Sequence, residues 1–194
     1  MQNIANKFDH LYKVISSTEF LSMESLGGEI PFFISAYDPK QQYEVEGAIH
    51  GLINKLENNG IPVLEINLYD IVYEILNNEL GEGEIFHIEE DMDKGEFKQA
   101  LQSILDIHDV LIPNIKAKVD SSNAKVYFLT GISLVFPYIR SHNILNNLQN
   151  VAKEAPTVAF FSGSYTGQSL DLFELMHDDN YYRAFIIDNY KIKA

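Results

Sequence analysis

Short apolar segments that fit strands buried on both faces recur along this chain and alternate with segments of helical periodicity. Thr157–Phe161 (TVAFF) is the clearest, because it is a continuous apolar run rich in β-branched and aromatic residues. Strands that alternate with helices form a mostly parallel sheet with helices on both faces. We therefore predict an α/β fold, a three-layer sandwich around a roughly five-stranded sheet, with strands at Glu29–Tyr37, Ile61–Leu68, Lys125–Thr130, Thr157–Phe161 and Tyr182–Ile187.

The segments between these strands carry apolar residues at helical spacing. The amino-terminal segment 1–28 is predicted to contain an amphipathic helix that packs on the domain. Asp38 and Pro39 supply an N-cap residue and a first-turn proline, so a second helix is predicted to begin there and to stop at Asn59–Gly60. Because no linker divides the chain, we expect 1–194 to form a single α/β domain.

The connection between the second and third predicted strands contains an acidic segment. Glu79–Glu96 holds eight acidic residues and one basic residue, Lys94. We predict that this segment, 79–96, is a solvated excursion with little structure of its own. The longest helical stripe follows, at Phe97–Ile112, and is predicted to end near Pro113 because proline clashes with the preceding turn.

The charge and composition of the chain exclude several classes of function. Its formal charge is −14, from 28 acidic and 14 basic side chains, whereas nucleic-acid binding depends on clustered Lys and Arg. The absence of cysteine removes disulfides, thiolate nucleophiles and cysteine-based metal sites. The first residues, MQNIANKFDHLYKV, are polar and amphipathic and show no apolar core of the signal-peptide type, and no run approaches the roughly 20 apolar residues of a membrane span. We therefore expect a cytoplasmic protein that contacts neither nucleic acid nor membrane and binds a protein partner.

A turn bounded by two glycines follows the fourth predicted strand. It runs from Gly163 through Ser164 and Tyr165 to Gly167 and is predicted to lead into a compact helix. Helix N-termini after such turns bind anions through free backbone N–H groups. A nucleotide-hydrolysing P-loop needs a lysine after its last glycine, but Gln168 stands there. We predict a P-loop-NTPase-like fold that lacks a Walker A motif.

No segment carries a complete catalytic or metal-binding motif. The glycine-bounded turn resembles a nucleophile elbow, but G-x-S-x-G would place serine where Tyr165 stands. A serine hydrolase would also need a base and an acid, and His177 with Asp178 is the only such pair soon after the turn. His87 and the acids after it have metal-ligand residue types, but a charged loop is usually solvated. We expect no catalytic residue, metal site or cofactor, and rank an uncharacterised hydrolase last.

The chain contains only two arginines, Arg140 and Arg183. Arg183 follows Tyr182 at the start of the predicted fifth strand, where a guanidinium could hold a carboxylate or phosphate and stack on a tyrosine. The alternative is an internal ion pair with one of the many acidic side chains. The candidate interaction or ligand site therefore consists of Gly163, Ser164, Tyr165, Gly167, Tyr182 and Arg183.

Three segments together resemble the BrxB family, a core component of BREX bacteriophage-exclusion systems. They are IPFFISAYDPKQQYEVEGAIHGLINKLENNGIPVLEINLYDI, LTGISLVFPYIRSHNILNNL and FFSGSYTGQSLDLFELMHDDNYYRAF, and the resemblance covers nearly the full chain. Its most specific part is Gly163-x-Tyr165-x-Gly167, followed by Leu170, Phe173 and Tyr181–Phe185. The resemblance implies a bacterial antiviral protein with a P-loop-type fold, no Walker lysine and no catalytic residue. It also implies a role beside an ATPase, a methyltransferase and an alkaline-phosphatase-like PglZ protein, with PglZ as the direct partner.

Two hypotheses of different classes follow. In the first, the chain is a non-enzymatic adaptor of phage defence that contacts a larger protein around Tyr165, Tyr182 and Arg183, since Tyr and Arg are frequent interface anchors. In the second, the chain is a small-ligand or nucleotide sensor that binds an anion at the Gly163–Gly167 turn with help from Arg183.

Overall fold

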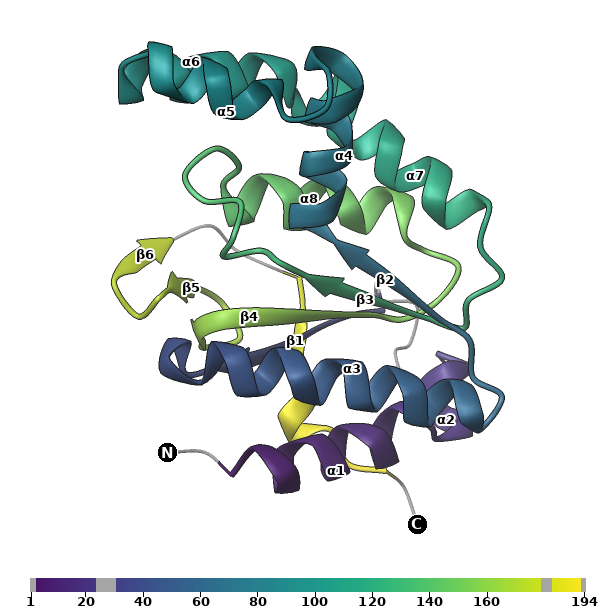
Figure 1. Ribbon diagram of the computed structural model, residues 1–194. Helices are drawn as coiled ribbons and strands as arrows, with labels where there is room; N and C mark the ends of the chain where they lie inside the picture. The colour runs from purple at the N-terminus through teal and green to yellow at the C-terminus, as the bar shows by residue number, and fades with distance from the viewer. Residues whose placement is uncertain (1–2, 24–30, 179–182, 193–194) are drawn as a thin grey trace.

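The computed structural model describes residues 3–23, 31–178 and 183–192. In these residues seven strands form one sheet, and five of them run parallel in the order β2-β3-β4-β1-β7 (Figure 1). The strands are β1 (Phe32–Tyr37), β2 (Val63–Asn67), β3 (Val126–Thr130), β4 (Thr157–Tyr165), β5 (Leu170–Leu172), β6 (Met176–Asp178) and β7 (Phe185–Ile186). The prediction of an α/β fold with a mostly parallel sheet is confirmed.

Helices cover both faces of this sheet (Figure 1). One face carries α1 (Ile4–Ile15), the short α2 (Thr18–Leu21) and α3 (Gln42–Asn58), and the other carries α4 (Leu68–Leu80), α7 (Ile112–Asp120) and α8 (Ser141–Val151). A pair of helices, α5 (Glu84–Asp91) and α6 (Lys94–Ile104), lies outside this second layer. Short helical turns occur at Pro39–Gln41, Ile107–Leu111 and Ile187–Asn189.

Alternate residues of each central strand supply two separate cores. Phe33, Phe128 and Phe160 point to the layer of α1 and α3 and are at most 2% exposed. Their strand neighbours, such as Leu129 and Phe161, point to the layer of α4, α7 and α8 and are fully buried. Burial on both faces explains why the strands read as continuous apolar runs.

Side-chain caps at the carboxyl ends of the strands set where the following helices begin. Asp38 accepts a hydrogen bond from the Lys40 backbone N–H at 2.9 Å, and Pro39 opens the short turn that leads into α3, as predicted. Asn67 ends β2 and caps α4 by accepting from the Tyr69 N–H at 3.0 Å. These caps satisfy backbone donors that the first turn of a helix leaves without partners.

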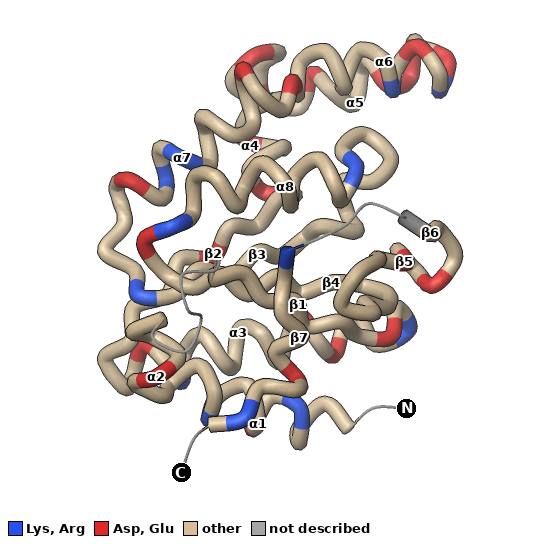
Figure 2. The backbone as a smooth tube through the Cα atoms, turned by 180° about the vertical axis from the view of Figure 1, so that it is seen from behind, with Lys and Arg blue, Asp and Glu red and all other residues tan. Residues whose placement is uncertain are grey.

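The acidic segment 79–96 is more ordered than predicted from the sequence, because it contains α5 and the start of α6. Asp93 caps α6 by accepting from the backbone N–H groups of Gly95 and Glu96. Ile85 of α5 and Phe97 and Leu101 of α6 are buried in the core and anchor two helices that are otherwise largely exposed. The acidic residues of this segment lie along these two helices, away from the sheet (Figure 2).

The prediction of one long helix after the acidic segment is wrong. The stripe Phe97–Ile112 is divided, because α6 ends at Ile104 and a short π-helical turn precedes α7. Pro113 does not end a helix either. It lies in the first turn of α7, where its missing N–H costs no hydrogen bond.

The bounds of all five predicted strands differ from the observed ones. The differences at β2 and β3 are one or two residues at an end, whereas β4 continues four residues beyond the predicted end, to Tyr165. Glu29, in the first predicted strand, lies outside the described residues, and β1 begins at Phe32. The fifth predicted strand is shortened to β7, Phe185–Ile186, and its first residue, Tyr182, also lies outside the described residues. Ile187, its last predicted residue, begins the helical turn Ile187–Asn189 instead.

Candidate functional site

The predicted site begins in β4, which continues through Gly163 and Ser164 to Tyr165. The predicted compact helix after it is wrong, because the chain turns at residues 166–169 and returns as the antiparallel strands β5 and β6. Thr166 closes this turn, since its hydroxyl accepts from the backbone N–H of Ser169 at 3.0 Å. A hairpin offers no helix N-terminus, so the predicted anion cradle is not formed there.

Gly163 is required by the close approach of β5. Its φ is +141°, and a Cβ added at this position would lie 2.0 Å from the backbone oxygen of Asp171. Only glycine fits such an approach without displacing the neighbouring strand. The glycine that was predicted to bound a ligand turn therefore has a structural role in pairing β4 with β5.

Ser164, Asp171 and His177 come together on the three strands of this hairpin region. The Ser164 hydroxyl donates to Asp171 Oδ2 at 3.2 Å, and His177 Nδ1 is hydrogen-bonded to Asp171 Oδ1. The acid thus lies between the serine and the histidine, whereas a hydrolytic triad places the histidine in the middle. The acid that meets His177 is Asp171, and not the neighbouring Asp178 considered from the sequence.

Tyr165 is directed into the protein. It is 9% exposed, and its hydroxyl donates to the backbone oxygen of Ala184 at 2.9 Å. This bond ties the end of β4 to the segment that precedes β7. The ring of Tyr165 is therefore not exposed to a partner.

The two arginines lie near opposite ends of α8. Arg140 is the N-cap residue of α8, and the backbone oxygen of Arg183 accepts from Gln149 Nε2 at 3.3 Å, about 12 Å along the helix from Ser141. Both arginines are exposed, and within the described residues neither takes part in an ion pair. Tyr182, the remaining predicted site residue, lies outside the described residues.

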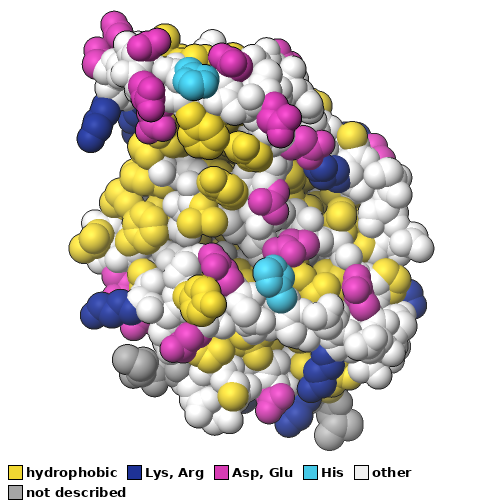
Figure 3. Space-filling model, viewed as in Figure 1, with side chains coloured by type: hydrophobic (Ala, Val, Ile, Leu, Met, Phe, Trp, Pro, Cys, Tyr) yellow, Lys and Arg dark blue, Asp and Glu magenta, His cyan; other side chains and the backbone are white. Residues whose placement is uncertain are grey.

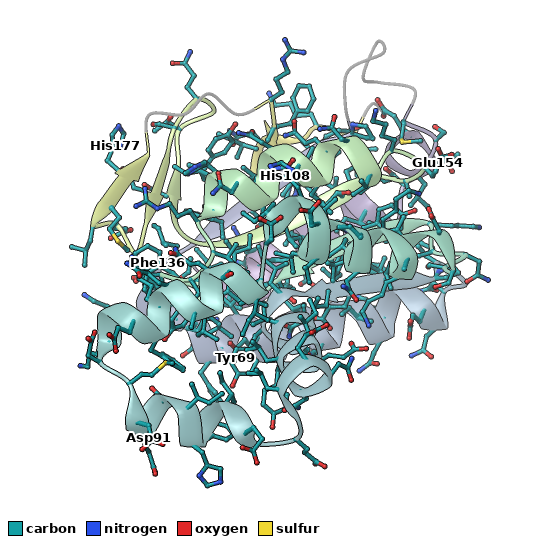
Figure 4. The ribbon with its side chains drawn as sticks, turned by 90° about the horizontal axis from the view of Figure 1, so that it is seen from above. Tyr69, Asp91, His108, Phe136, Glu154 and His177 are labelled. Carbon is teal, nitrogen blue, oxygen red and sulfur yellow. The ribbon has the colours of Figure 1, made fainter. Side chains whose placement is uncertain are left out.

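Arg140 borders a cavity of about 300 Å³ beside the hairpin. Its walls combine cationic or titratable groups with apolar side chains, namely Phe136, Arg140, Ser141, His142, Phe161, Leu170, Leu172, Met176 and His177. Figure 4 shows Phe136 and His177 on the side of the molecule where β5 and β6 lie. The sequence singles out Arg140 as one of two arginines, but no local signal indicates this convergence.

A second cavity, of about 230 Å³, lies at the carboxyl ends of β1, β2 and β3, against α3. Its described lining residues are Tyr37, Gln42, Glu46, Ile49, His50, Glu65, Asn67, Thr130, Gly131, Leu134 and Phe160. In an open α/β sheet this edge is where ligands bind. The strand ends at this edge can be predicted from the sequence. The presence there of Glu46, from α3, and of Glu65, from within β2, cannot.

Hydrogen bonds organise this second cavity. The Tyr37 hydroxyl donates to Gln42 Oε1 at 2.8 Å, and Gln42 Nε2 donates to Glu46 Oε1 at 2.7 Å. The Thr130 hydroxyl donates to Glu65 Oε1 at 2.7 Å. Burial raises the pKa of Tyr37 to about 12, so its hydroxyl stays protonated and remains a donor at neutral pH.

Two other kinds of site find no support in the part of the chain that the structure describes. It contains no group of three or more His, Asp and Glu side chains that could hold a metal ion. It also contains no helix that is long and apolar enough to cross a membrane.

The model of the family described as BREX protein BrxB matches residues 64–187 of this chain. A BREX protein BrxB of Bacillus cereus (strain H3081.97) is 34% identical over 189 residues, which cover 95% of this chain and 97% of the relative. This chain belongs to the BrxB family. Another BrxB, of Escherichia coli O9:H4 (strain HS), is 27% identical over 171 residues, covering 88% of this chain and 84% of the relative. No solved structure matches the chain.

The match to the BrxB family confirms the resemblance seen in the sequence. The matched residues run from β2 to the end of β7 and include the hairpin region, Glu65 and both arginines. Glu46, on α3, precedes them.

Proposed function

We propose that this BrxB protein is a non-enzymatic, cytoplasmic component of a bacterial BREX phage-exclusion system. It acts as an adaptor that binds a larger BREX protein, with the alkaline-phosphatase-like PglZ protein as the partner. Membership of the BrxB family is the observation that carries this proposal. The proposal includes no direct contact with nucleic acid, in keeping with a formal charge of −14.

The exposed surface supports a role in protein binding. Tyr43 is 88% exposed and Tyr69 50%, and tyrosine is enriched at protein interfaces because it combines apolar area with a polar end. Phe86 is 56% exposed on α5, among the acidic side chains of that helix. Acidic surfaces with exposed aromatic rings fit basic partner surfaces.

The connection after β1 supports the proposal of a P-loop-like fold that does not bind nucleotides. β1 lies inside the sheet and leads through Asp38 and Pro39 into α3, the place where a phosphate-binding loop would stand. This connection contains no glycine, and the adjoining cavity carries Glu46 and Glu65. Carboxylates at this edge oppose the binding of phosphate groups.

The hairpin geometry supports the non-enzymatic part of the proposal. The Ser164 hydroxyl donates to Asp171, and no described histidine accepts a hydrogen bond from it. A serine becomes a nucleophile when a base such as histidine takes its proton. The arrangement instead links β4, β5 and β6.

The proposal is tested by affinity purification from a host that carries the whole BREX gene cluster, with mass spectrometry of the bound proteins. We expect the PglZ-family protein to remain bound through washing. Recovery of this chain without any other BREX protein would overturn the proposal. Arg183→Ala, with Arg140→Ala as the matched control, then tests whether the predicted arginine contributes to the contact.

A second candidate function, a small-ligand or nucleotide sensor, is favoured by the cavity beside Arg140. Arg140, His142 and His177 line it together with apolar side chains, which suits an anion with an apolar body. A ligand that binds only the folded state raises its melting temperature. A nucleotide panel that shifts the melting temperature of the wild type, and not of Arg140→Ala, would favour this function over the adaptor.

A further inference from the structure

The second cavity holds two carboxylates, and among the described residues that line it only His50 could carry a positive charge. Glu46 and Glu65 are half-buried, and none of the described residues that line the cavity is Lys or Arg. Each carboxylate accepts through Oε1 from a neutral donor, Gln42 or Thr130. Within the described residues, no hydrogen bond or ion pair reaches either Oε2 atom.

A cation that enters this cavity would bind favourably to the two carboxylates. Removing carboxylates from water is costly unless a counter-charge or hydrogen bonds compensate. The neutral donors hold each carboxylate in place through one oxygen and leave the other oxygen available. A group with several N–H donors and a positive charge complements both acids at once.

The surroundings of the cavity indicate which cation fits. Leu134 lines the cavity and is 47% exposed, while Tyr43 adjoins the lining residue Gln42 and Tyr69 lies two residues after the lining residue Asn67. Figure 3 shows acidic side chains and a histidine over α3, with hydrophobic side chains beside them. A guanidinium can stack flat on an aromatic ring while its planar fork binds carboxylates, whereas an ammonium has no planar fork.

The cavity is too small and too acidic for a nucleotide. Its volume of about 230 Å³ lies below the range of roughly 300–1,000 Å³ for pockets that hold drug-sized ligands. A single side chain is a better match for such a space. Because the described residues offer no three-ligand metal group, a protein side chain also fits better than a divalent ion.

We propose that the cavity between α3 and the carboxyl ends of β1, β2 and β3 receives an arginine side chain of the protein partner, whose guanidinium binds Glu46 and Glu65. This inference rests on the proposed adaptor function and names the surface and the chemical group that the adaptor recognises. Tyr37 and Thr130 fix the geometry of the cavity, and the exposed tyrosines near its rim contact the partner around the inserted side chain.

The first test uses a small probe and does not depend on the partner. N-acetyl-arginine amide is titrated into the ¹⁵N-labelled protein, with N-acetyl-citrulline amide as a neutral probe of the same shape. We expect the arginine probe to shift the amide signals of Gln42, Thr130 and Gly131, and the shifts to vanish in the double variant Glu46→Gln/Glu65→Gln. Equal shifts with citrulline, or in the double variant, would overturn the proposal, as would no shift at these amides.

The second test measures capture of the partner. Glu46→Gln/Glu65→Gln should recover about tenfold less of the partner identified by mass spectrometry. The matched control Glu57→Gln/Glu154→Gln removes two exposed carboxylates elsewhere and should change recovery by less than about twofold. Wild-type recovery by the first variant refutes the cavity proposal alone, whereas no capture by the wild type refutes the adaptor function.

Discussion

The same face of the sheet carries two charged sites that are built in opposite ways. Near α1, Lys7 Nζ lies 2.6 Å from Asp188 Oδ1 and also donates to the backbone oxygen of Ala36 at 2.8 Å. At the carboxyl edge, Glu46 and Glu65 have only neutral donors among the described residues. At the first site the protein itself supplies the opposite charge. At the second site the opposite charge would have to come from a bound group.

The difference separates a structural site from the proposed binding site. The Lys7 side chain is 3% exposed, and its charge is tolerated because Asp188 and a backbone oxygen surround it. Burial lowers the pKa of Lys7, while the charge of Asp188 opposes that shift. The half-buried carboxylates of the cavity remain open to a cation from outside. Four variants test this separation.

Lys7→Met tests the structural site. We expect it to lower the free energy of unfolding by about 3–5 kcal/mol, because it leaves Asp188 without its charged partner. Urea unfolding followed by circular dichroism measures the loss. Lys118→Met, which breaks an exposed pair with Glu74, is the control and should cost no more than about 1 kcal/mol. A similar small loss in Lys7→Met would contradict the assignment.

Gly163→Ala tests whether the hairpin region is also structural. A Cβ would lie 2.0 Å from the Asp171 backbone oxygen, so we expect a loss of about 2–4 kcal/mol in the same measurement. Gly51→Ala is the control, because its Cβ would meet nothing within 4 Å on α3. That substitution should stabilise the protein by about 0.5–1 kcal/mol. Equal effects at both glycines would show that β5 does not constrain Gly163.

Tyr37→Phe tests the wall of the cavity through its pH dependence. The folded-state pKa of Tyr37 is raised to about 12 from 10.0, so its contribution is complete below pH 10 and is lost as pH rises through 12. The wild type should lose about 2–3 kcal/mol more than Tyr37→Phe over this interval. Denaturant unfolding at a series of alkaline pH values measures the difference. Parallel curves for the two proteins would show that Tyr37 is not buried as described.

Glu46→Gln/Glu65→Gln should change stability least. Replacing two carboxylates that have no ion-pair partner among the described residues should change the free energy of unfolding by less than about 1 kcal/mol, in favour of the folded state. Urea unfolding at neutral pH measures it, with Lys7→Met as the contrasting variant. A loss above about 2 kcal/mol would mean that the carboxylates serve the fold, and the separation between the two sites would fail.

The central strands could be predicted from the sequence because burial on both faces leaves a local signature. Phe32–Tyr37 and Val126–Thr130 both lie within predicted strands. The compact helix predicted after the Gly163–Gly167 turn is wrong, since a few apolar residues with mixed spacing fit a short helix as well as a hairpin. The hairpin forms because Leu170–Leu172 pairs with β4, and this tertiary contact leaves no local pattern in the sequence.

The sites could be predicted only in part. Lys7 and Asp188 are 181 residues apart, so no local pattern indicates their pairing. Glu46 and Glu65 belong to different elements and converge only after β2 has taken its place beside β3. The carboxyl edge itself follows from the fold class. Asp93 is a typical N-cap residue and indicates the start of α6, but the acidic composition of 79–96 favours the prediction of a solvated loop instead.

Titration calorimetry of this protein with the purified PglZ-family protein, its proposed partner, is the decisive experiment for the proposed adaptor function and its acidic cavity. We expect binding that weakens as salt is raised, because the acidic protein attracts a basic partner surface. We also expect Glu46→Gln/Glu65→Gln to weaken binding at low salt while Glu57→Gln/Glu154→Gln does not. Absence of binding at low salt, with both proteins folded, would contradict the adaptor role.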